Sequence, residues 1–470
     1  MSRHGIRVVI AGGGVAALET MLALRELAGH RIELTVVCPE RSFLYRPVTV
    51  AEAFGRGEAR EYPLGDICHY CGDSQLIWDA LAQVDSDARV AVTATGERIS
   101  YDALVVTAGA IPRDPLPGAL TFAGRGSVAG FSELLDDLVS GSARSVVMTM
   151  PSEQMWPLPI YELALMTAGH LREHSSEAKV LLVTPEEEPL ELFGPAAARA
   201  IEPMLQVRGI KLRTGSLPAL IQGRTLTLAG GSVIVTDRVV TMPVLEGPRL
   251  SGLPSDAHGF IPTDHHGRVR GVTDVYAAGD VTAYPLKQGG LATQQADAVA
   301  ESIAAELGLP ITPRPFRPVL RGLLMTGGAP LYLRSEPQRL RHDASVAIDT
   351  SPRRWSARDA SSAAGQPLWW PPAKIAGRYL GPFLATARPQ PLGAGLLADR
   401  APVPGPPVSE TEYEDALGLA LLLADCDARW GDYSAALEAL EAAEALEGAL
   451  PHEYEEKRRQ WRAAEHSSSL

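Results

Sequence analysis

The sequence IRVVIAGGGVAALETMLALREL, residues 6–27, decides the fold. Its first six residues, Ile6–Ala11, are typical of a short buried strand, and its second half has helical spacing. The glycine-rich turn between them permits a tight bend, lets the backbone approach a pyrophosphate and keeps the helix close to the strand. The residues expected at this turn are Gly12, Gly14, Ala16 and Ala17. The stretch therefore predicts a dinucleotide-binding unit in which the helix N-terminus faces the anion.

The next strand is expected at Ile32–Val37, at the distance that such a unit requires. An acidic residue after this strand commonly holds the adenosine ribose of the dinucleotide. The nearest candidate is Glu40, which comes two residues later than usual because Cys38-Pro39 intervenes. We expect Glu40 to take this role.

Two later segments indicate which dinucleotide binds. The segment YDALVVTAGA, residues 101–110, predicts a strand that ends in small residues at Ala108-Gly109, and TDVYAAGD, residues 273–280, predicts a strand that ends in Gly279-Asp280. With these three motifs in this order, the chain resembles the two-dinucleotide-fold flavoproteins of the pyridine nucleotide–disulfide oxidoreductase superfamily, over roughly residues 5–385. The resemblance implies FAD as cofactor, with Asp280 hydrogen-bonded to the ribitol.

The segment after Asp280 predicts a helix that begins near Gly290. It resembles the flavin-contacting helix of sulfide:quinone oxidoreductases and type II NADH dehydrogenases, and Arg46-Pro47 resembles their early flavin-lining loop. The resemblance implies that the helix N-terminus faces the flavin and stabilises its reduced form. Lys287 is the candidate catalytic residue because it would add a full positive charge; the alternative is a solvated surface lysine. The other flavin contacts expected here are Gln288, Gly289 and Gly290.

A second unit of strand, helix and strand is predicted at 145–150, 160–170 and 179–184. Relatives that use NAD(P)H carry a second glycine fingerprint in its first turn. Here that turn reads MPSEQMWPLP, residues 150–159, and contains no glycine. The acidic run at 186–188 is typical of a surface turn, with an NAD ribose site as the alternative. NAD(P)H binding is therefore left open, since a helix N-terminus can bind an anion without glycines.

The cysteines argue against sulfide chemistry. The related sulfide-oxidising enzymes use cysteines near the flavin, but no cysteine occurs between Cys71 and Cys426. Cys68 and Cys71 are expected to be buried structural thiols, because this pair lacks the usual place of a redox disulfide at a helix start. A single pair also makes a poor zinc site, so no metal site is expected.

The C-terminal third predicts strands at 318–324 and 331–334 and an extended loop over 335–368. The aromatic and cationic stretch 369–380 is expected to pack over the flavin domain, with an interfacial membrane element as the alternative. After a proline-rich linker, helices are predicted at 413–430, 433–446 and 451–465, resembling one degenerate tetratricopeptide repeat. A single repeat cannot bury its own apolar face, so it should dock on the body, on a second subunit or on another protein.

Composition excludes several classes of protein. The chain has 470 residues, 46% of them hydrophobic, with only 6% aromatic residues and a net charge of −13, so a nucleic-acid binder is not expected. The charge is local, since residues 409–470 hold 15 acidic and 5 basic residues. Four cysteines make no disulfide framework, and no signal-peptide or membrane-spanning pattern is present. A cytoplasmic protein is expected, with peripheral contact on the cytoplasmic face of a membrane left open.

The sequence thus predicts an α/β fold with two Rossmann-like dinucleotide-binding domains, the second inserted in the first, a small C-terminal α+β domain and an α-helical tail. The expected ranges are 1–115 with 245–311, 116–244, 312–400, a linker at 401–408 and the tail at 409–466. The expected function is an FAD-dependent oxidoreductase that passes two electrons from a small-molecule donor to a quinone or small redox acceptor. A sulfide:quinone-type oxidoreductase and a flavin-bound scaffold with a partner-recruiting tail are the alternatives.

Overall fold

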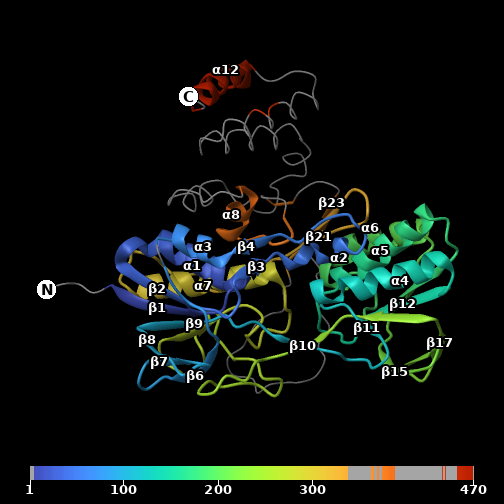
Figure 1. Ribbon diagram of the computed structural model, residues 1–470, viewed down its shortest axis with the longest axis horizontal. Helices are drawn as coiled ribbons and strands as arrows, with labels where there is room; N and C mark the ends of the chain where they lie inside the picture. Colours follow the sequence, from blue (N-terminus) through green and yellow to red (C-terminus); the bar gives the residue numbers. More distant parts are fainter. Residues whose placement is uncertain are drawn as a thin grey trace. The chain divides into compact units, whose positions relative to one another are not determined.

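The computed structural model describes residues 5–72, 74–336, 361–364, 368–369, 373–386, 437, 440 and 452–468 (Figure 1). The chain divides into two compact units. The first comprises residues 1–365 with 371–400, and the second comprises 366–370 with 401–470. The first unit contains both parallel sheets, and each unit is described by itself.

The first parallel sheet has the strand order β20-β9-β1-β2-β5. Its strands are β1 (Ile6–Ala11), β2 (Ile32–Val37), β5 (Gln75–Ile77), β9 (Ala103–Val106) and β20 (Val275–Ala277). All neighbouring pairs are parallel. Because β20 comes from a part of the chain beyond the second sheet, the second domain is inserted in the first, as predicted.

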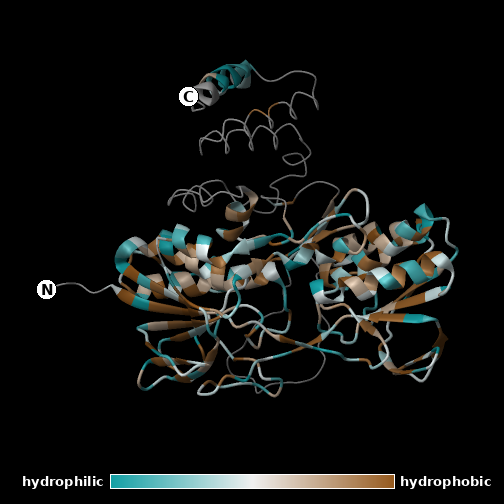
Figure 2. Cartoon of the chain, viewed as in Figure 1, coloured by the Kyte–Doolittle hydropathy of each residue, from teal (hydrophilic) through white to brown (hydrophobic). Residues whose placement is uncertain are grey.

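Helices α1 (Val15–Ala28) and α7 (Gly289–Glu306) pack against each other and against one face of this sheet (Figure 1). Helix α1 is rich in alanine and leucine and helix α7 in alanine, and most of these side chains are buried with those of the strands. Figure 2 shows the strands of this sheet as largely hydrophobic, which is typical of a parallel sheet covered on both faces. Smaller elements of this domain are β3 (Ser42–Leu44), η2 (Arg46–Val48), α2 (Thr49–Glu52), β4 (Glu61–Pro63), α3 (Leu64–Tyr70), β6 (Leu81–Asp85), β7 (Val90–Thr93) and β8 (Arg98–Ser100).

The second parallel sheet has the order β11-β18-β12-β13-β14. Its strands are β11 (Leu120–Thr121), β12 (Ser145–Thr149), β13 (Lys179–Val183), β14 (Lys211–Arg213) and β18 (Arg238–Thr241). Helices α4 (Val128–Ser140), α5 (Leu158–Glu173) and α6 (Pro195–Val207) share its hydrophobic core. The antiparallel strands β10 (Ile111–Arg113) and β19 (Val244–Glu246) connect the two domains, and β15 (Pro218–Gln222), β16 (Thr225–Leu228) and β17 (Val233–Val235) form a side sheet.

A three-stranded antiparallel sheet follows, made of β21 (Leu320–Leu324), β22 (Leu331–Ser335) and β23 (Ser361–Ala364). The first two strands confirm the prediction. The loop predicted for 335–368 is wrong at β23, since its sequence SSAA carries no apolar alternation and becomes a strand only by pairing with β22.

Residues 373–380 of the aromatic and cationic stretch pack on the first domain, and α8 (Leu380–Thr386), which begins at the end of this stretch, contacts α1. Ile375, Tyr379 and Leu380 are buried in the same core as α1 and α7. The predicted packing over the flavin domain is therefore confirmed for these residues.

A pair of buried carboxyl groups holds this segment in place. Glu19 of α1 is fully buried and accepts hydrogen bonds from the backbone N–H of Tyr379 (2.9 Å) and of Leu380 (2.7 Å). Its carboxyl group also hydrogen-bonds that of Asp297 on α7. Two carboxyl groups in contact must share a proton, and burial raises the pKa of Glu19 to about 7.

We expect this pair to lower stability at alkaline pH. A carboxyl with a raised folded-state pKa stabilises the protein fully below its unfolded pKa of about 4.5, and that contribution is lost as the pH rises through about 7. Asp297→Asn keeps the hydrogen bond to Glu19 without the second charge. Urea unfolding at pH 6 and pH 8.5 should therefore show a smaller loss of stability in the variant than in the wild type. Equal losses would contradict this account.

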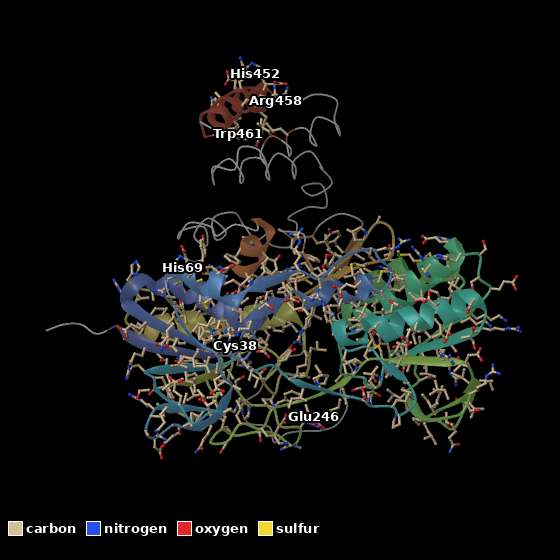
Figure 3. The ribbon with its side chains drawn as sticks, in the orientation of Figure 1. Cys38, His69, Glu246, His452, Arg458 and Trp461 are labelled. Atoms are coloured by element: carbon tan, nitrogen blue, oxygen red, sulfur yellow. The ribbon has the colours of Figure 1, made fainter. Side chains whose placement is uncertain are left out.

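In the second unit, α12 (His452–Ser468) confirms the last predicted helix of the tail. Arg458 pairs with Glu455 at 2.7 Å, and Lys457 lies over the Tyr454 ring at 4.1 Å (Figure 3). The helix predicted at 413–430 lies outside the described residues, as does the one at 433–446 apart from Leu437 and Leu440. No helix among the described residues is long and apolar enough to cross a membrane.

Candidate functional site

The glycine turn after β1 forms an open N-terminus on α1. Gly12 has φ +138°, and a Cβ atom there would lie 2.4 Å from the Thr107 carbonyl oxygen. A Cβ atom on Gly14, by contrast, would meet no atom within 4 Å. The N-cap of α1 is Gly14, so no side chain caps the helix. No acidic residue lies in the first helical turn. The Gly12 N–H donates to the Val37 carbonyl at 2.8 Å, whereas the N–H groups at the start of α1 have no acceptor among the described residues and can bind an anion.

The three predicted motifs meet at one edge of the first sheet. Ala11 of β1 and Ala277 of β20 both pair with Val106 of β9, so the small residues after these strands lie side by side. Gly109 and Gly279 have φ values of +72° and +81°. Gly279 approaches Ala16 so closely that an added Cβ atom would lie 2.9 Å from the alanine Cβ, while Ala108 is exposed and Ala17 is buried. The structure therefore brings these predicted residues together.

Glu40 lies just beyond β2, where the sequence predicts the ribose-binding acid. It is exposed, and its Oε2 accepts a hydrogen bond from the Cys38 thiol at 3.0 Å. Cys38 is buried within the first domain (Figure 3). Burial, followed by the hydrogen bond to Glu40, raises the pKa of this thiol to about 12, so it stays protonated. The ribose role of Glu40 remains a prediction.

Asp280 follows β20 and has no hydrogen bond from any residue that the structure describes. Burial raises the pKa of its carboxyl, whereas the positive charges of Lys287 and Arg46 lower it. The carboxylate therefore lies among cations but has no hydrogen-bond donor. Pro47 directly follows Arg46 in the short helical turn η2.

Lys287 is partly buried and is not the solvated surface lysine of the alternative interpretation. Its ammonium donates a hydrogen bond to the carbonyl of Thr282 and lies 3.7 Å from the centre of the Phe260 ring. Burial lowers the pKa of Lys287 to about 8, which the charges of Asp280 and Asp256 oppose. Lys287 is thus held near Asp280 by its own loop, and a catalytic role remains a prediction.

Helix α7 begins at Gly289, one residue before the predicted start. The Gln288 side chain caps it by accepting a hydrogen bond from the Leu291 N–H at 2.8 Å. Gly290 is buried, and a Cβ atom on Gly289 would lie 3.0 Å from the Ile375 side chain. The small residues thus allow a distant segment to pack on the N-terminus of α7.

That segment supplies an ion pair that the sequence did not predict. Lys374 donates hydrogen bonds to both carboxylate oxygens of Glu162 on α5, at 2.6 and 2.7 Å. Glu162 is 0% exposed and also accepts a hydrogen bond from the Met325 N–H at 2.9 Å. Burial raises the pKa of Glu162 and lowers that of Lys374, and in each case the partner opposes the shift.

The pair lies next to the other site residues. The N–H of Ile375, the neighbour of Lys374, donates to the Tyr45 hydroxyl at 3.0 Å, and Tyr45 precedes Arg46. The same Ile375 packs on Gly289. Only two features of the sequence could have pointed to the Glu162–Lys374 pair. They are the scarcity of lysine and the presence of an acidic residue in the otherwise apolar start of α5.

These residues fit FAD. The open α1 N-terminus can bind the pyrophosphate, because a Cβ atom at Gly14 would enter empty space that the cofactor can use. The Asp280 carboxylate, which lacks a donor among the described residues, can accept a hydrogen bond from the ribitol hydroxyls.

The glycine-free turn before α5 does not fit a dinucleotide as the glycine turn before α1 does. Helix α5 starts with Pro157 as its N-cap and Pro159 in its first turn, so two N–H groups that could bind a pyrophosphate are missing. The Trp156 ring lies 5.4 Å from that of Phe193. Gly322 of β21 packs directly over this region, since a Cβ atom there would lie 2.7 Å from both Leu158 and Phe193.

The acidic residue after β13 is also engaged. Oε2 of Glu186 accepts hydrogen bonds from the Tyr161 hydroxyl (2.6 Å) and the Thr184 hydroxyl (2.8 Å). Burial raises the pKa of Glu186 to about 7. The surface turn predicted for 186–188 is therefore correct for Glu187 and Glu188 but wrong for Glu186, which turns inward. The acid that could have held an NAD ribose is thus hydrogen-bonded to Tyr161 and Thr184 instead.

Comparison with known proteins settles the family. The model of the pyridine nucleotide-disulphide oxidoreductase family matches residues 6–147 and 162–300, which is more than half of the chain. The chain belongs to this family. It is an FAD-dependent oxidoreductase, and the match leaves out residues 148–161, which include the glycine-free turn before α5.

Several relatives share much of this family fold. An NADH dehydrogenase-like protein of Mycobacterium tuberculosis is 28% identical over 296 residues, covering 59% of this chain and 73% of the relative. The sulfide-quinone reductase of Aquifex aeolicus is 24% identical, covering 65% and 77%. The crystal structure of the Aquifex aeolicus sulfide:quinone oxidoreductase has a TM-score of 0.64 at 20% identity, covering 71% of this chain and 84% of that one. A putidaredoxin reductase–putidaredoxin complex gives 0.54 at 17% identity, covering 71% and 82%.

The described cysteines of this chain are buried thiols. Cys68 and Cys71 are buried and free, and burial raises their pKa values to about 11 and 12. They are buried, unpaired thiols, as predicted; Cys426 lies outside the described residues. Within the described part of the chain, no group of three His, Cys, Asp or Glu residues could hold a metal ion.

Proposed function

We propose that this flavoprotein passes two electrons from a reduced donor through FAD to a quinone or another small redox acceptor. The observation that carries the proposal is the buried Glu162–Lys374 pair beside the N-terminus of α7. FAD, when bound, supplies the two-electron chemistry. The relatives named as quinone reductases and the structure solved with a small redox protein support these acceptor classes.

Different residues of the chain have different roles in this proposed electron transfer. The N-terminus of α1 binds the pyrophosphate, and Asp280 accepts from the ribitol. The N-terminus of α7, with Arg46 and Lys287, offsets the negative charge that reduction brings. The reduction of a quinone to a quinol takes up protons. The buried pair of Glu162 and Lys374 can hold a proton next to this site.

The nature of the donor stays open within this proposal. The filled second turn counts against NAD(P)H, although relatives of the chain are named as NADH dehydrogenase-like. The absence of cysteine between Cys71 and Cys426 counts against sulfide oxidation through cysteines near the flavin. Cytoplasmic location, peripheral membrane contact, a homodimer and a protein partner of the tail remain predictions from the sequence.

Anaerobic spectroscopy tests the proposal. The yellow holoprotein should be reduced by light with a sacrificial donor and then reoxidised by a soluble quinone analogue. Glu162→Gln should slow this reoxidation by about a hundredfold, because it removes the carboxylate that positions the Lys374 ammonium, the proton donor of the ion pair. Glu173→Gln, an exposed residue on the same helix, is the matched control and should not change the rate.

Mixing with NADH, NADPH and sulfide in the same apparatus identifies the donor. Rapid bleaching by NADH or NADPH would show that the second turn binds a nucleotide after all, and bleaching by sulfide would support the sulfide:quinone alternative. If none of these donors reduces the holoprotein and no quinone reoxidises it, the result would instead favour the flavin-bound scaffold.

A further inference from the structure

The C-terminal sheet carries two arginines side by side on the face away from its core. Arg321 of β21 lies opposite Arg334 of β22, and Arg334 lies opposite Ser362 of β23. Leu320 and Leu333 belong to the core shared with the second domain. Because side chains alternate between the two faces of a strand, the two arginines and the serine form one row across the other face.

The charges in this row are not balanced. The guanidinium of Arg321 makes no hydrogen bond or ion pair with the described residues. Arg334 is only 6% exposed; one of its terminal nitrogens pairs with Glu336, but its Nε is buried and has no acceptor. Two like charges directly opposite each other destabilise a sheet. Among the described residues, Glu336 is the only carboxylate that pairs directly with the two positive charges of this row.

Arg321 remains charged at neutral pH. Burial, followed by the nearby charge of Arg334, lowers the pKa of Arg321 to about 10, while Glu336 and Asp297 oppose this shift. A value of about 10 still leaves the guanidinium cationic at neutral pH. Arg321 is also only partly buried, so a ligand can reach it from solvent.

We propose that the row Arg321–Arg334–Ser362 is a binding site for a phosphate group. Planar guanidinium groups bind phosphate oxygens through paired N–H donors, and the serine hydroxyl adds a further donor. A ligand with a single carboxylate could form its hydrogen bonds with Arg321 alone. The oxygens of a phosphate group can instead accept hydrogen bonds from all three side chains. The phosphate can belong to a soluble ester or to the headgroup of an anionic lipid.

The site is connected to the flavin helix. The Gln288 side chain that caps α7 also donates a hydrogen bond to the carbonyl of Arg321 at 3.4 Å. The side chain of Gln294, six residues after Gln288, hydrogen-bonds both the backbone N–H and the carbonyl of Val319. A ligand that binds at Arg321 and orders β21 would therefore also affect the N-terminus of α7.

The first test is phosphate binding by the FAD-loaded protein. Thermal unfolding is followed at increasing inorganic phosphate, with sodium chloride keeping the ionic strength constant. A specific ligand raises the midpoint in a saturable way. Arg321→Met should weaken the apparent Kd at least about tenfold, because a charge-assisted contact is lost. Arg321→Lys, which keeps the charge, should recover part of the affinity.

Arg224→Met is the matched control. Arg224 is an exposed arginine that pairs with Asp237 in the second domain, so its loss should leave phosphate binding unchanged. The flavin content of each variant, measured by absorbance, shows whether the cofactor domain is intact. None of these readouts depends on electron transfer, so the result is separate from the test of the proposed function.

The second test distinguishes the two sources of phosphate. Sedimentation is measured with phosphatidylcholine vesicles, with and without phosphatidylglycerol. Binding to the anionic vesicles that Arg321→Met abolishes identifies a lipid headgroup. Saturable stabilisation by free phosphate, dependent on Arg321 and without vesicle binding, identifies a soluble ligand. The proposal is wrong if wild type and Arg321→Met respond alike in both tests.

Discussion

A Gly14→Ala variant should fold normally and fail to retain FAD. A Cβ atom at this position meets no protein atom within 4 Å, so the substitution creates no clash in the protein itself. The new methyl group instead lies where the pyrophosphate must approach the backbone at the start of α1. We expect the affinity for FAD to fall on the order of a hundredfold, which corresponds to about 3 kcal/mol.

The measurement is the ratio of flavin to protein absorbance after purification, followed by titration of the apoprotein with FAD. Gly169→Ala is the matched control, since this glycine of α5 also has no atom within 4 Å of an added Cβ and lies in the other domain. It should stay yellow. A Gly14→Ala protein that binds FAD as tightly as the wild type would show that the cofactor does not use this turn.

Gly12→Ala should behave differently from Gly14→Ala. Its Cβ atom would lie 2.4 Å from the Thr107 carbonyl, and its φ of +138° is unfavourable for any residue with a side chain. This variant should therefore lose stability even without FAD, so the apoproteins of the two variants should differ in their thermal midpoints. The comparison separates a glycine required by the protein from one required by the cofactor.

Lys374→Met should destabilise the protein by about 3–5 kcal/mol, because it leaves the buried carboxylate of Glu162 without its cation. The loss should appear as a lower free energy of unfolding in urea at pH 7, measured with saturating FAD. The double variant Glu162→Gln/Lys374→Met should recover most of it, because neither residue then carries a buried charge.

An exposed ion pair provides the control. Arg113 and Glu246 lie 3.0 Å apart, and each side chain is about half exposed. Arg113→Met should change the free energy of unfolding by no more than about 1 kcal/mol. If Lys374→Met were equally mild, Glu162 would have to be protonated and neutral in the folded protein, and its proposed role as a charged partner of Lys374 would fail.

The local motifs of the first domain could be predicted from the sequence because backbone geometry demands particular residues there. A strand, a glycine turn and a helix within residues 6–28 define an anion site whatever the rest of the chain does. The strand ends at Gly109 and Gly279-Asp280 follow the same rule, and parallel pairing brings them to one edge. The lack of glycine before α5 likewise anticipated a turn in which Pro157 and Pro159 remove two N–H donors and Trp156 packs against Phe193.

The sequence alone therefore determined the family and the cofactor and predicted the edge of the sheet where the cofactor would bind, since these depend on short patterns with strict steric requirements. Only the tertiary structure decided what lies around that edge. Glu162 and Lys374 are 212 positions apart, and Glu19 meets Leu380 across 361. No local pattern specifies such contacts, because they arise when packing and burial select one arrangement of distant segments. The partners of Glu162, Glu19 and Arg321 belong to the fold and not to any stretch of the sequence.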